Sequence, residues 1–174
     1  MGVIMRLAYG GSIRFKYRTV DGAEDSGKTP SFLILDGQQR LTSIYCAAYS
    51  HNPVKTWRER GKTIRRFYYL DINKCLYAID RTEAVFSVPE DRKLRGMDLS
   101  TRDLEYEHEM FPLSIIFDSN AREDWADGYK EYHKYSKEFI EKYNRFINEV
   151  IYTMTGYKLP VIRIEEATKE AVCK

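Results

Sequence analysis

The sequence has few cysteines, no long apolar run and no strong excess of charge, and these shortages exclude several classes of protein. Its three cysteines, Cys46, Cys75 and Cys173, are widely spaced and odd in number, so they predict neither a disulfide framework nor a Cys-x-x-Cys metal site. We expect them to be reduced and at least Cys46 to lie in the core. No run of about 18 apolar residues occurs, so we expect no membrane span. The first residues lack the charged and apolar regions of a secretory signal, and we therefore expect a cytoplasmic protein.

Charges of the two signs nearly balance, at a net charge of +2, which neither favours nor excludes nucleic acid as a partner. What the sequence does contain is 14 tyrosines. Tyrosine rings can stack on bases, but they serve equally well as half-buried surface on strands and helices. With 43% apolar and 31% charged residues, the chain has the profile of a globular domain, and we expect one domain over residues 1–174.

The first part of the sequence predicts two strands joined by a loop and followed by a helix. Residues 12–18 alternate between apolar and basic side chains, the pattern of a half-buried strand with one basic face. Residues 20–30 are rich in glycine and charge and predict a loop between antiparallel strands. The wholly apolar run 32–35 predicts a strand buried on both faces. From Leu41 the apolar spacing becomes helical.

The remainder mixes strands and helices, so the predicted fold class is α+β with a long helical segment. We expect strands at 65–71, 75–80 and 84–88 with a hairpin turn at 73–74, an irregular surface excursion at 90–109, core residues at 111–113, one or two helices over 121–154 ending at Gly156, a strand at 159–164 and a helix at 165–174. The chain ends inside that last helix, so we expect a piece of a longer protein.

A cluster of polar residues, 36–40, separates the apolar strand from the helix. Polar groups directly after a buried strand need partners or water, because unpaired buried polar groups are costly. Gly37 permits a backbone conformation that other residues resist and lets a ligand approach the backbone closely, and the helix start offers free N–H groups and a positive dipole end, which together favour an anion such as phosphate. Arg40 adds a charged fork for phosphate oxygens, and Thr42 or Ser43 adds a hydroxyl.

The other three residues of the cluster have different expected roles. Asp36 suits Mg²⁺ coordination or the orientation of a water molecule. Gln38 and Gln39 can position water or hydrogen-bond a base, ribose or phosphate, without acting as acid or base. A purely structural alternative remains open, in which Asp36 caps the helix, the glycine makes the turn and the arginine forms a surface ion pair.

Residues 34–43, Ile-Leu-Asp-Gly-Gln-Gln-Arg-Leu-Thr-Ser, closely resemble the signature of the DGQQR family. This family comprises the ParB-like N-terminal domain of GmrSD-type modification-dependent restriction enzymes and the related Ssp phosphorothioate-sensing effectors. The resemblance implies a ParB/sulfiredoxin-like core with a small mixed sheet, in which Gly37 and Arg40 hold nucleotide phosphates. It also implies hydrolysis of a nucleoside triphosphate with Mg²⁺, in antiphage defence against modified DNA; GTP, ATP and CTP are not distinguished.

The resemblance places the nuclease of such systems in an HNH domain or subunit outside this sequence. His51, His108 and His133 are isolated, so we expect no DNA cleavage from this chain, and Glu107-His108-Glu109 is only a weak candidate for metal. Two other functions stay open: a non-catalytic DNA-binding module, and a structural partner domain with a degenerate site. The oligomeric state also stays open.

Basic residues give two candidate contacts with DNA phosphate. The basic face of the strand expected at 12–18 is the better one, because its charges are regularly spaced and close to the motif in sequence. It carries Arg14, Lys16 and Arg18. The second is the cluster around Trp57, which more closely fits a solvated loop because Glu59 interrupts it.

Overall fold

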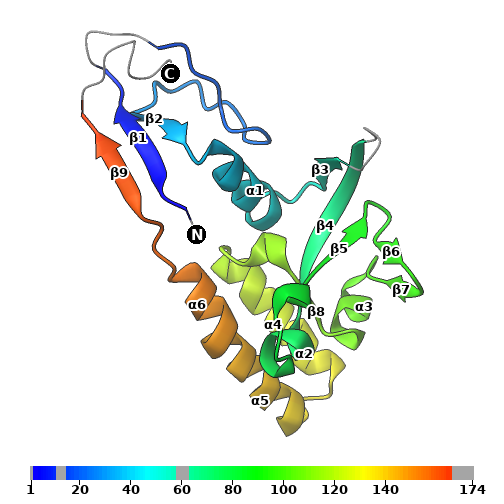
Figure 1. Ribbon diagram of the computed structural model, residues 1–174. Coiled ribbons are helices and arrows are strands. Elements are labelled where there is room, and N and C mark those ends of the chain that lie inside the picture. The colour runs from blue at the N-terminus through cyan, green and yellow to red at the C-terminus, as the bar shows by residue number, and fades with distance from the viewer. Residues whose placement is uncertain (1, 11–14, 58–62, 166–174) are drawn as a thin grey trace. The chain divides into compact units, whose positions relative to one another are not determined.

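The computed structural model describes residues 2–10, 15–57 and 63–165, and Figure 1 shows their arrangement. The chain divides into two compact units: unit 1 comprises residues 1–45 and 158–174, and unit 2 comprises residues 46–157. Small sheets and several helices make up these units, which confirms the α+β class. In the described ranges, no helix combines the length and the apolar character that a membrane crossing requires.

Unit 1 is built on a three-stranded sheet in the order β2-β1-β9. The central strand β1 (Ile4–Ala8) runs antiparallel to β2 (Phe32–Asp36) and parallel to β9 (Val161–Ile164), as Figure 1 shows. The backbone N–H of Ile4 also donates to the carbonyl of Pro160 at 3.0 Å. The sheet therefore joins the beginning of the described chain to a strand far along the sequence.

The strand expected at 12–18 is wrong for its described part, since residues 15–18 form neither helix nor strand, and Arg14 lies outside the described residues. The physical reason is that the more apolar segment β1 supplies the partner for β2, so residues 16–18 stay exposed. The loop expected at 20–30 is confirmed, and it connects antiparallel strands. Strand β2 is confirmed too, but it is half-buried because it lies at the edge of the sheet.

Unit 2 contains a sheet centred on the long strand β4 (Thr63–Asp71). Its antiparallel partners are β3 (Val54–Trp57), β5 (Val85–Pro89) and β8 (Met110–Pro112), and a separate hairpin pairs β6 (Lys93–Leu94) with β7 (Met97–Asp98). The strands expected at 65–71 and 84–88 are thereby confirmed. So is the core position of residues 111–113, which are all buried.

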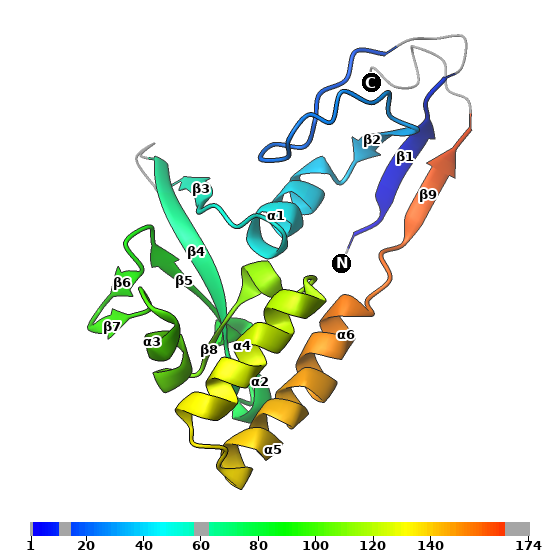
Figure 2. The same ribbon diagram turned by 180° about the vertical axis from the view of Figure 1, so that it is seen from behind.

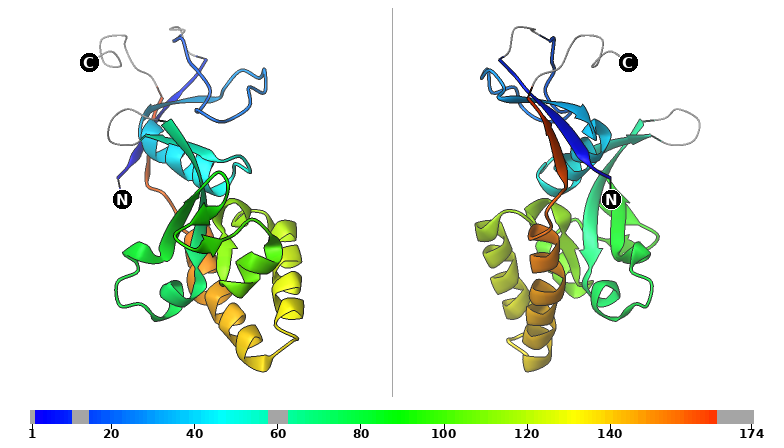
Figure 3. Two further views of the ribbon diagram at one scale, coloured as in Figure 1. Left: turned by 90° about the vertical axis from the view of Figure 1, so that its right-hand side faces the viewer. Right: turned by 60° about the vertical axis from the view of Figure 1, so that its left-hand side comes forward.

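Helices complete unit 2, and the longest are α4 and the rod that begins with α5 (Figure 2). The helical elements are α2 (Ile72–Tyr77), the 3-10 turns η1 (Thr82–Ala84) and η2 (Leu113–Ile115), α3 (Arg102–Glu107), α4 (Ser119–Tyr132), α5 (Lys137–Phe146), the π-helical segment η3 (Ile147–Ile151) and α6 (Tyr152–Thr155). Figure 3 shows α5, η3 and α6 as one continuous rod beside α4. The helical stretch expected at 121–154 is therefore confirmed as two pieces, and Gly156 is its C-cap.

Three expectations for unit 2 were wrong. Residues 75–80 are not a strand, because Asp71 accepts a hydrogen bond from the Lys74 N–H at 2.9 Å and so starts α2 where a hairpin turn was expected. Segment 90–109 is not an irregular surface excursion: it holds β6, β7 and α3, and Leu99 is fully buried. Cys46 is only partly buried. The helix expected at 165–174 lies almost wholly outside the described residues.

Aromatic rings dominate the core of unit 2. Trp125 and Tyr129 of α4 stack with ring centroids 5.2 Å apart, and Trp125 also meets Phe111 of β8 edge-on at 5.1 Å. Tyr143 of α5 completes the group at 5.8 Å from Trp125. Since fully burying one large apolar side chain is worth about 1.5–3 kcal/mol, this cluster is a main source of stability. Tyr129 and Tyr143 of the long helical stretch therefore pack in the core, whereas Tyr132 and Tyr152 are exposed.

One carboxylate, that of Glu105 in α3, is buried beside this core with an exposed fraction of 1%. It accepts hydrogen bonds from the Tyr69 hydroxyl at 3.3 Å, the Trp125 indole N–H at 3.1 Å and Arg102 at 2.8 Å, and Arg92 lies 3.4 Å away. Burial raises the pKa of the Glu105 carboxyl, and Arg102 opposes that rise. The single acid thus links α3 to β4 and α4.

Candidate functional site

The polar cluster 36–40 lies at a tight turn between β2 and α1 (Gln38–Ala48), in unit 1. The helix begins three residues earlier than the sequence predicts, and its first backbone bond runs from the Leu41 N–H to the Gly37 carbonyl at 3.0 Å. The N–H groups of Gln38, Gln39 and Arg40 therefore precede the helical bonding pattern. Such a helix start attracts anions.

Gly37 occupies a position of this turn where a side chain would be strained and crowded. Its φ is +88°, a left-handed conformation that other residues adopt only with strain. A Cβ atom there would lie 3.1 Å from Cδ1 of Ile4 and 3.2 Å from Nη2 of Arg40. The backbone angle therefore favours glycine strongly, and a side chain here would also displace Ile4 or Arg40 slightly.

Arg40 is held against β1 by its guanidinium group. Its Nη2 donates to the carbonyl of Val3 at 2.6 Å and lies 3.4 Å from Oδ2 of Asp36. The side chains of Arg40 and Asp36 are 47% and 72% exposed. An arginine side chain has five N–H donors, so these contacts leave others for a ligand.

Of the structural alternative, the glycine turn and the surface ion pair of Arg40 are present in the described ranges, but the capping role of Asp36 is not. Within the described part of the chain, the Asp36 carboxylate contacts only Arg40, and no backbone N–H of α1 donates to it. An exposed ion pair of this kind contributes at most about 1 kcal/mol. The fold thus gains little from Asp36, and its carboxylate is accessible from solvent.

Some of the neighbouring polar side chains are hydrogen-bonded to the backbone, and others are accessible to a ligand. The Gln38 amide donates to the Ile34 carbonyl at 2.7 Å, and the Ser43 hydroxyl donates to the Gln39 carbonyl at 2.9 Å, so these two side chains face their own backbone. Gln39 is exposed, and Thr42 is half-buried in the first turns of the helix. The structure therefore brings Asp36, Gly37, Gln39 and Arg40 together at the turn.

The residues predicted to meet DNA are not gathered on a strand. Lys16 and Arg18 are exposed on the connection between β1 and β2, where Arg18 lies 3.7 Å from Asp21, and Arg14 is not among the described residues. Of the cluster around Trp57, residues 58–62 also fall outside the description. Arg65 pairs with Glu90 at 3.2 Å.

Sequence reasoning missed a pair of arginines in the unit 1 sheet. Arg6 of β1 and Arg163 of β9 lie directly side by side in the parallel register, and their guanidinium carbons lie 4.2 Å and 5.2 Å from the ring centre of Phe32. Nε of Arg6 is buried and has no hydrogen-bond partner among the residues described. No local sequence pattern signals this pair, because it depends on the pairing of β1 with β9.

Metal ligands are sparse. In the described ranges, no group of three or more histidine, cysteine, aspartate or glutamate side chains is close enough together to hold a metal ion. Glu109, part of the weak sequence candidate, is instead buried and paired with Lys142 at 2.8 Å. Burial also raises the pKa of the Cys75 thiol to about 11, so that cysteine is neutral at neutral pH.

Comparison with known proteins places this site in a family context. The family described as GmrSD restriction endonuclease, N-terminal domain, matches residues 3–174. A protein of Methanocaldococcus jannaschii, named as uncharacterized protein MJ0686, is 31% identical over 141 residues. That alignment covers 78% of this chain and 22% of the relative, so the chain spans about a fifth of the relative's length. No solved structure matches.

Proposed function

The chain belongs to the family of N-terminal domains of GmrSD restriction endonucleases, and from this premise we propose that residues 36–42 bind a nucleoside triphosphate and hydrolyse it. The observation that carries the proposal is the turn at Gly37. It places the free N–H groups of a helix start, an arginine fork and an exposed carboxylate beside one another, and the fold gains little from the acid.

In this proposal the backbone N–H groups of residues 38–40 and the guanidinium of Arg40 hold the phosphates. The contact of Arg40 with the Val3 carbonyl fixes the direction of the fork before the nucleotide binds. Thr42 supplies the hydroxyl more readily than Ser43, whose hydrogen is already donated to Gln39. Gln39 positions the attacking water, because the Gln38 amide is turned back onto β2.

Asp36 is the residue that would hold Mg²⁺. One exposed carboxylate next to a phosphate site fits this ion, which keeps several waters and takes its remaining ligands from the substrate phosphates. Bound Mg²⁺ would stabilise the negative charge that develops on the phosphate oxygens during hydrolysis. Asp36 Oδ2, which contacts Arg40 in the structure, would then contact the ion or an ordered water in place of Arg40.

The proposed fold and biological role follow the same family. The three-stranded sheet of unit 1, with its glycine turn into α1, supports a ParB/sulfiredoxin-like core. The proposed role is nucleotide-dependent action on modified DNA in antiphage defence, with an HNH nuclease domain or subunit performing the cleavage. We place the protein in the cytoplasm.

The test is nucleotide binding and phosphate release by the purified chain with GTP, ATP and CTP, with and without Mg²⁺. Arg40→Ala is expected to weaken nucleotide binding by at least about tenfold, since a charge-assisted bond is lost. Asp36→Ala is expected to abolish phosphate release while leaving much of the binding.

Two exposed residues of unit 1 provide matched controls, Lys28→Ala for the arginine and Asp25→Ala for the acid. Neither control is expected to change binding or phosphate release. If both motif variants behave like their controls, the proposal is wrong.

A second candidate function is contact with DNA phosphate, and the arginine pair of the unit 1 sheet favours it. Like charges side by side on neighbouring strands repel each other, and no acid contacts Arg6 in the described part of the chain. Arg163 is paired with Glu165 at 2.6 Å, so it is partly neutralised. A phosphate group beside Arg6 would relieve the repulsion.

This candidate is tested by DNA affinity at several salt concentrations. Arg6→Ala should weaken binding and reduce the salt dependence by about one phosphate contact, and Lys28→Ala should not. The triple change of Arg14, Lys16 and Arg18 to alanine tests the competing placement on the β1–β2 connection. A DNA affinity that is unaffected by either set of changes would contradict both placements.

A further inference from the structure

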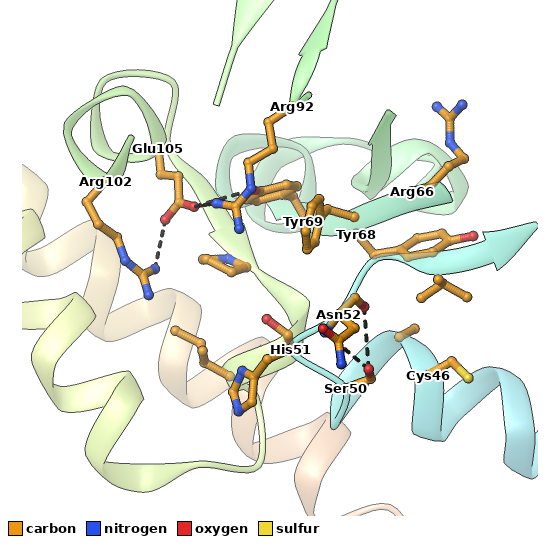
Figure 4. Close-up of a pocket in the computed structure, with 16 residues that line it drawn as sticks. Cys46, Ser50, His51, Asn52, Arg66, Tyr68, Tyr69, Arg92, Arg102 and Glu105 are labelled. Atoms are coloured by element: carbon orange, nitrogen blue, oxygen red, sulfur yellow. Dashed lines mark hydrogen bonds and ion pairs between the residues drawn. The ribbon is translucent and has the colours of Figure 1, made fainter. Parts of the chain in front are cut away.

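Unit 2 contains a pocket of about 140 Å³ that the proposed function does not use. Figure 4 shows its lining, which comes from the end of α1, the loop at residues 50–52, strands β3 and β4, helix α3, the β5–β6 connection that carries Arg92, and residues 112–115. Its charged lining consists of three arginines, Arg66, Arg92 and Arg102, and one acid, Glu105. The pocket thus carries an excess of positive charge.

Two of these arginines are oriented by the same buried carboxylate. Arg92 pairs with Oε1 of Glu105 at 3.4 Å and Arg102 with Oε2 at 2.8 Å. In Figure 4 the guanidinium groups of Arg92 and Arg102 both lie beside the Glu105 carboxylate, each joined to it by a dashed line. Since the acid is 1% exposed while the arginine side chains are 34% and 52% exposed, the two cations face the pocket from a fixed base.

Burial of Glu105 does not require both arginines. The Tyr69 hydroxyl and the Trp125 indole already donate to it, and Arg102 supplies a close opposite charge. The backbone of Arg92 nevertheless has a φ of +59°, a conformation that costs an arginine more free energy than it would cost a glycine. Its guanidinium also packs on Phe67, 4.3 Å from the ring centre, so its side chain is held as firmly as its backbone.

The wall opposite the arginines carries hydrogen-bonding groups. Ser50, His51 and Asn52 line it, and Figure 4 shows the three on the loop that faces Arg92 and Arg102. Tyr68 and Tyr69 add aromatic surface beside them. A pair of oriented guanidinium groups with polar side chains opposite them is an arrangement that binds phosphate oxygens in proteins.

We propose that this pocket is a second phosphate-binding site, in which Arg92 and Arg102 bind one phosphate group of a nucleotide, either free or within a DNA strand. The site is separate from the turn at Gly37 and depends on none of its residues. Arg66 is not part of it, because its guanidinium donates to the hydroxyl and carbonyl of Ser87.

Trp125 gives a direct readout, because its indole shares the Glu105 carboxylate with Arg102. Replacing the other tryptophan, by Trp57→Phe, leaves Trp125 as the single source of tryptophan fluorescence. The probes are inorganic phosphate, deoxycytidine monophosphate and a single-stranded oligodeoxynucleotide, each titrated into the full chain. We expect a saturable change of Trp125 emission with at least one of them.

Arg102→Gln should weaken that binding by at least about tenfold. Its side chain is half-exposed, so the chain should still fold, and thermal unfolding verifies this. The matched control is Arg145→Gln, which removes a similarly exposed arginine paired with Glu149. The control should bind as the parent chain does.

The outcomes separate the ligand sources and the two sites. Tighter binding of the oligonucleotide than of the mononucleotide assigns the pocket to DNA, and equal binding assigns it to a free nucleotide. Arg40→Ala should leave the Trp125 signal unchanged, so failure of the proposed turn does not affect this test. No saturable signal with any probe, or equal affinity in the two glutamine variants, overturns the proposal.

Discussion

Units 1 and 2 of this chain are stabilised in different ways. Among the described residues, unit 1 contributes only Ile4 and Leu7 to the buried apolar set, while unit 2 contains large clusters of buried apolar residues. The candidate nucleotide turn lies in the unit with the small core. Its geometry therefore depends on backbone conformation and a few specific contacts rather than on close packing.

In unit 2, buried polar groups add specific contacts to the large apolar core. Glu105 and Glu109 are both nearly inaccessible, and both accept hydrogen bonds from aromatic residues of the core as well as pairing with basic side chains. Such networks are costly to break, because each lost partner leaves a buried donor unpaired. The comparison predicts large effects for acids in unit 2 and for glycine geometry in unit 1.

The largest expected effect is that of Glu105→Ala. Removing this carboxylate leaves the Tyr69 hydroxyl and the Trp125 indole without their buried acceptor, so the free energy of unfolding should fall by about 3–5 kcal/mol. Urea unfolding followed by circular dichroism measures the change. Glu149→Ala, which breaks only an exposed pair with Arg145, should cost less than about 1 kcal/mol. Equal losses would remove the distinction between buried and surface acids.

Gly37→Ala should have the next largest effect, confined to unit 1. The strained φ costs about 1–2 kcal/mol, and the crowding against Ile4 adds to it. Gly27→Ala is the control, because Gly27 has a φ of +65° in open space and so suffers the strain alone. Hydrogen exchange should show faster opening of β1 and β2 in Gly37→Ala and unchanged protection in β4. Faster exchange throughout unit 2 would contradict the separation of the units.

A smaller loss is expected from Asp118→Ala at the start of α4. The Asp118 carboxylate accepts a hydrogen bond from the Ala121 N–H at 3.0 Å, and losing an N-cap costs about 1 kcal/mol. Asp118→Asn keeps a capping oxygen and should be nearly neutral. The midpoint of thermal unfolding measures both, and a loss for asparagine as large as that for alanine would argue against capping as the cause.

The smallest effect on stability is expected from Arg40→Lys. The lysine keeps the positive charge but loses the forked geometry, so the bond to the Val3 carbonyl weakens, at a cost of about 0.5–1 kcal/mol. Nucleotide affinity should fall more than stability does, and titration calorimetry next to urea unfolding compares the two. A lysine variant that binds nucleotide as tightly as the parent would show that the fork is not needed.

Local sequence signals predicted the motif turn and the long helices correctly. The change from the apolar run 32–35 to helical spacing from Leu41 marks a strand, a turn and a helix without reference to the rest of the chain, although the helix begins three residues earlier. The prediction of a strand at 75–80 is wrong. Ile72, Cys75 and Leu76 have helical spacing, and Asp71 before them is a helix-capping residue, so the local sequence already indicates a helix.

Other features depend on long-range contacts and could not be predicted. The partners of Glu105 include Tyr69 and Trp125, which are 36 and 20 residues away in the sequence, so no local pattern marks that acid as buried. The charge-rich segment around it resembles a solvated loop. Likewise, the adjacency of Arg6 and Arg163 exists only because β1 and β9 pair in parallel.

The parallel pairing of β1 with β9 has a consequence for synthesis of the protein. The strand that completes the unit 1 sheet is made only after all of unit 2, since unit 2 lies between β2 and β9 in the sequence. Domains fold as units during synthesis, and an isolated two-stranded hairpin is marginally stable at best. Unit 2 can therefore fold on the ribosome while β1 and β2 still await their partner. The turn at Gly37 is then among the last described parts to form, so a chain released before Val161 would contain a folded unit 2 and an incomplete unit 1 sheet.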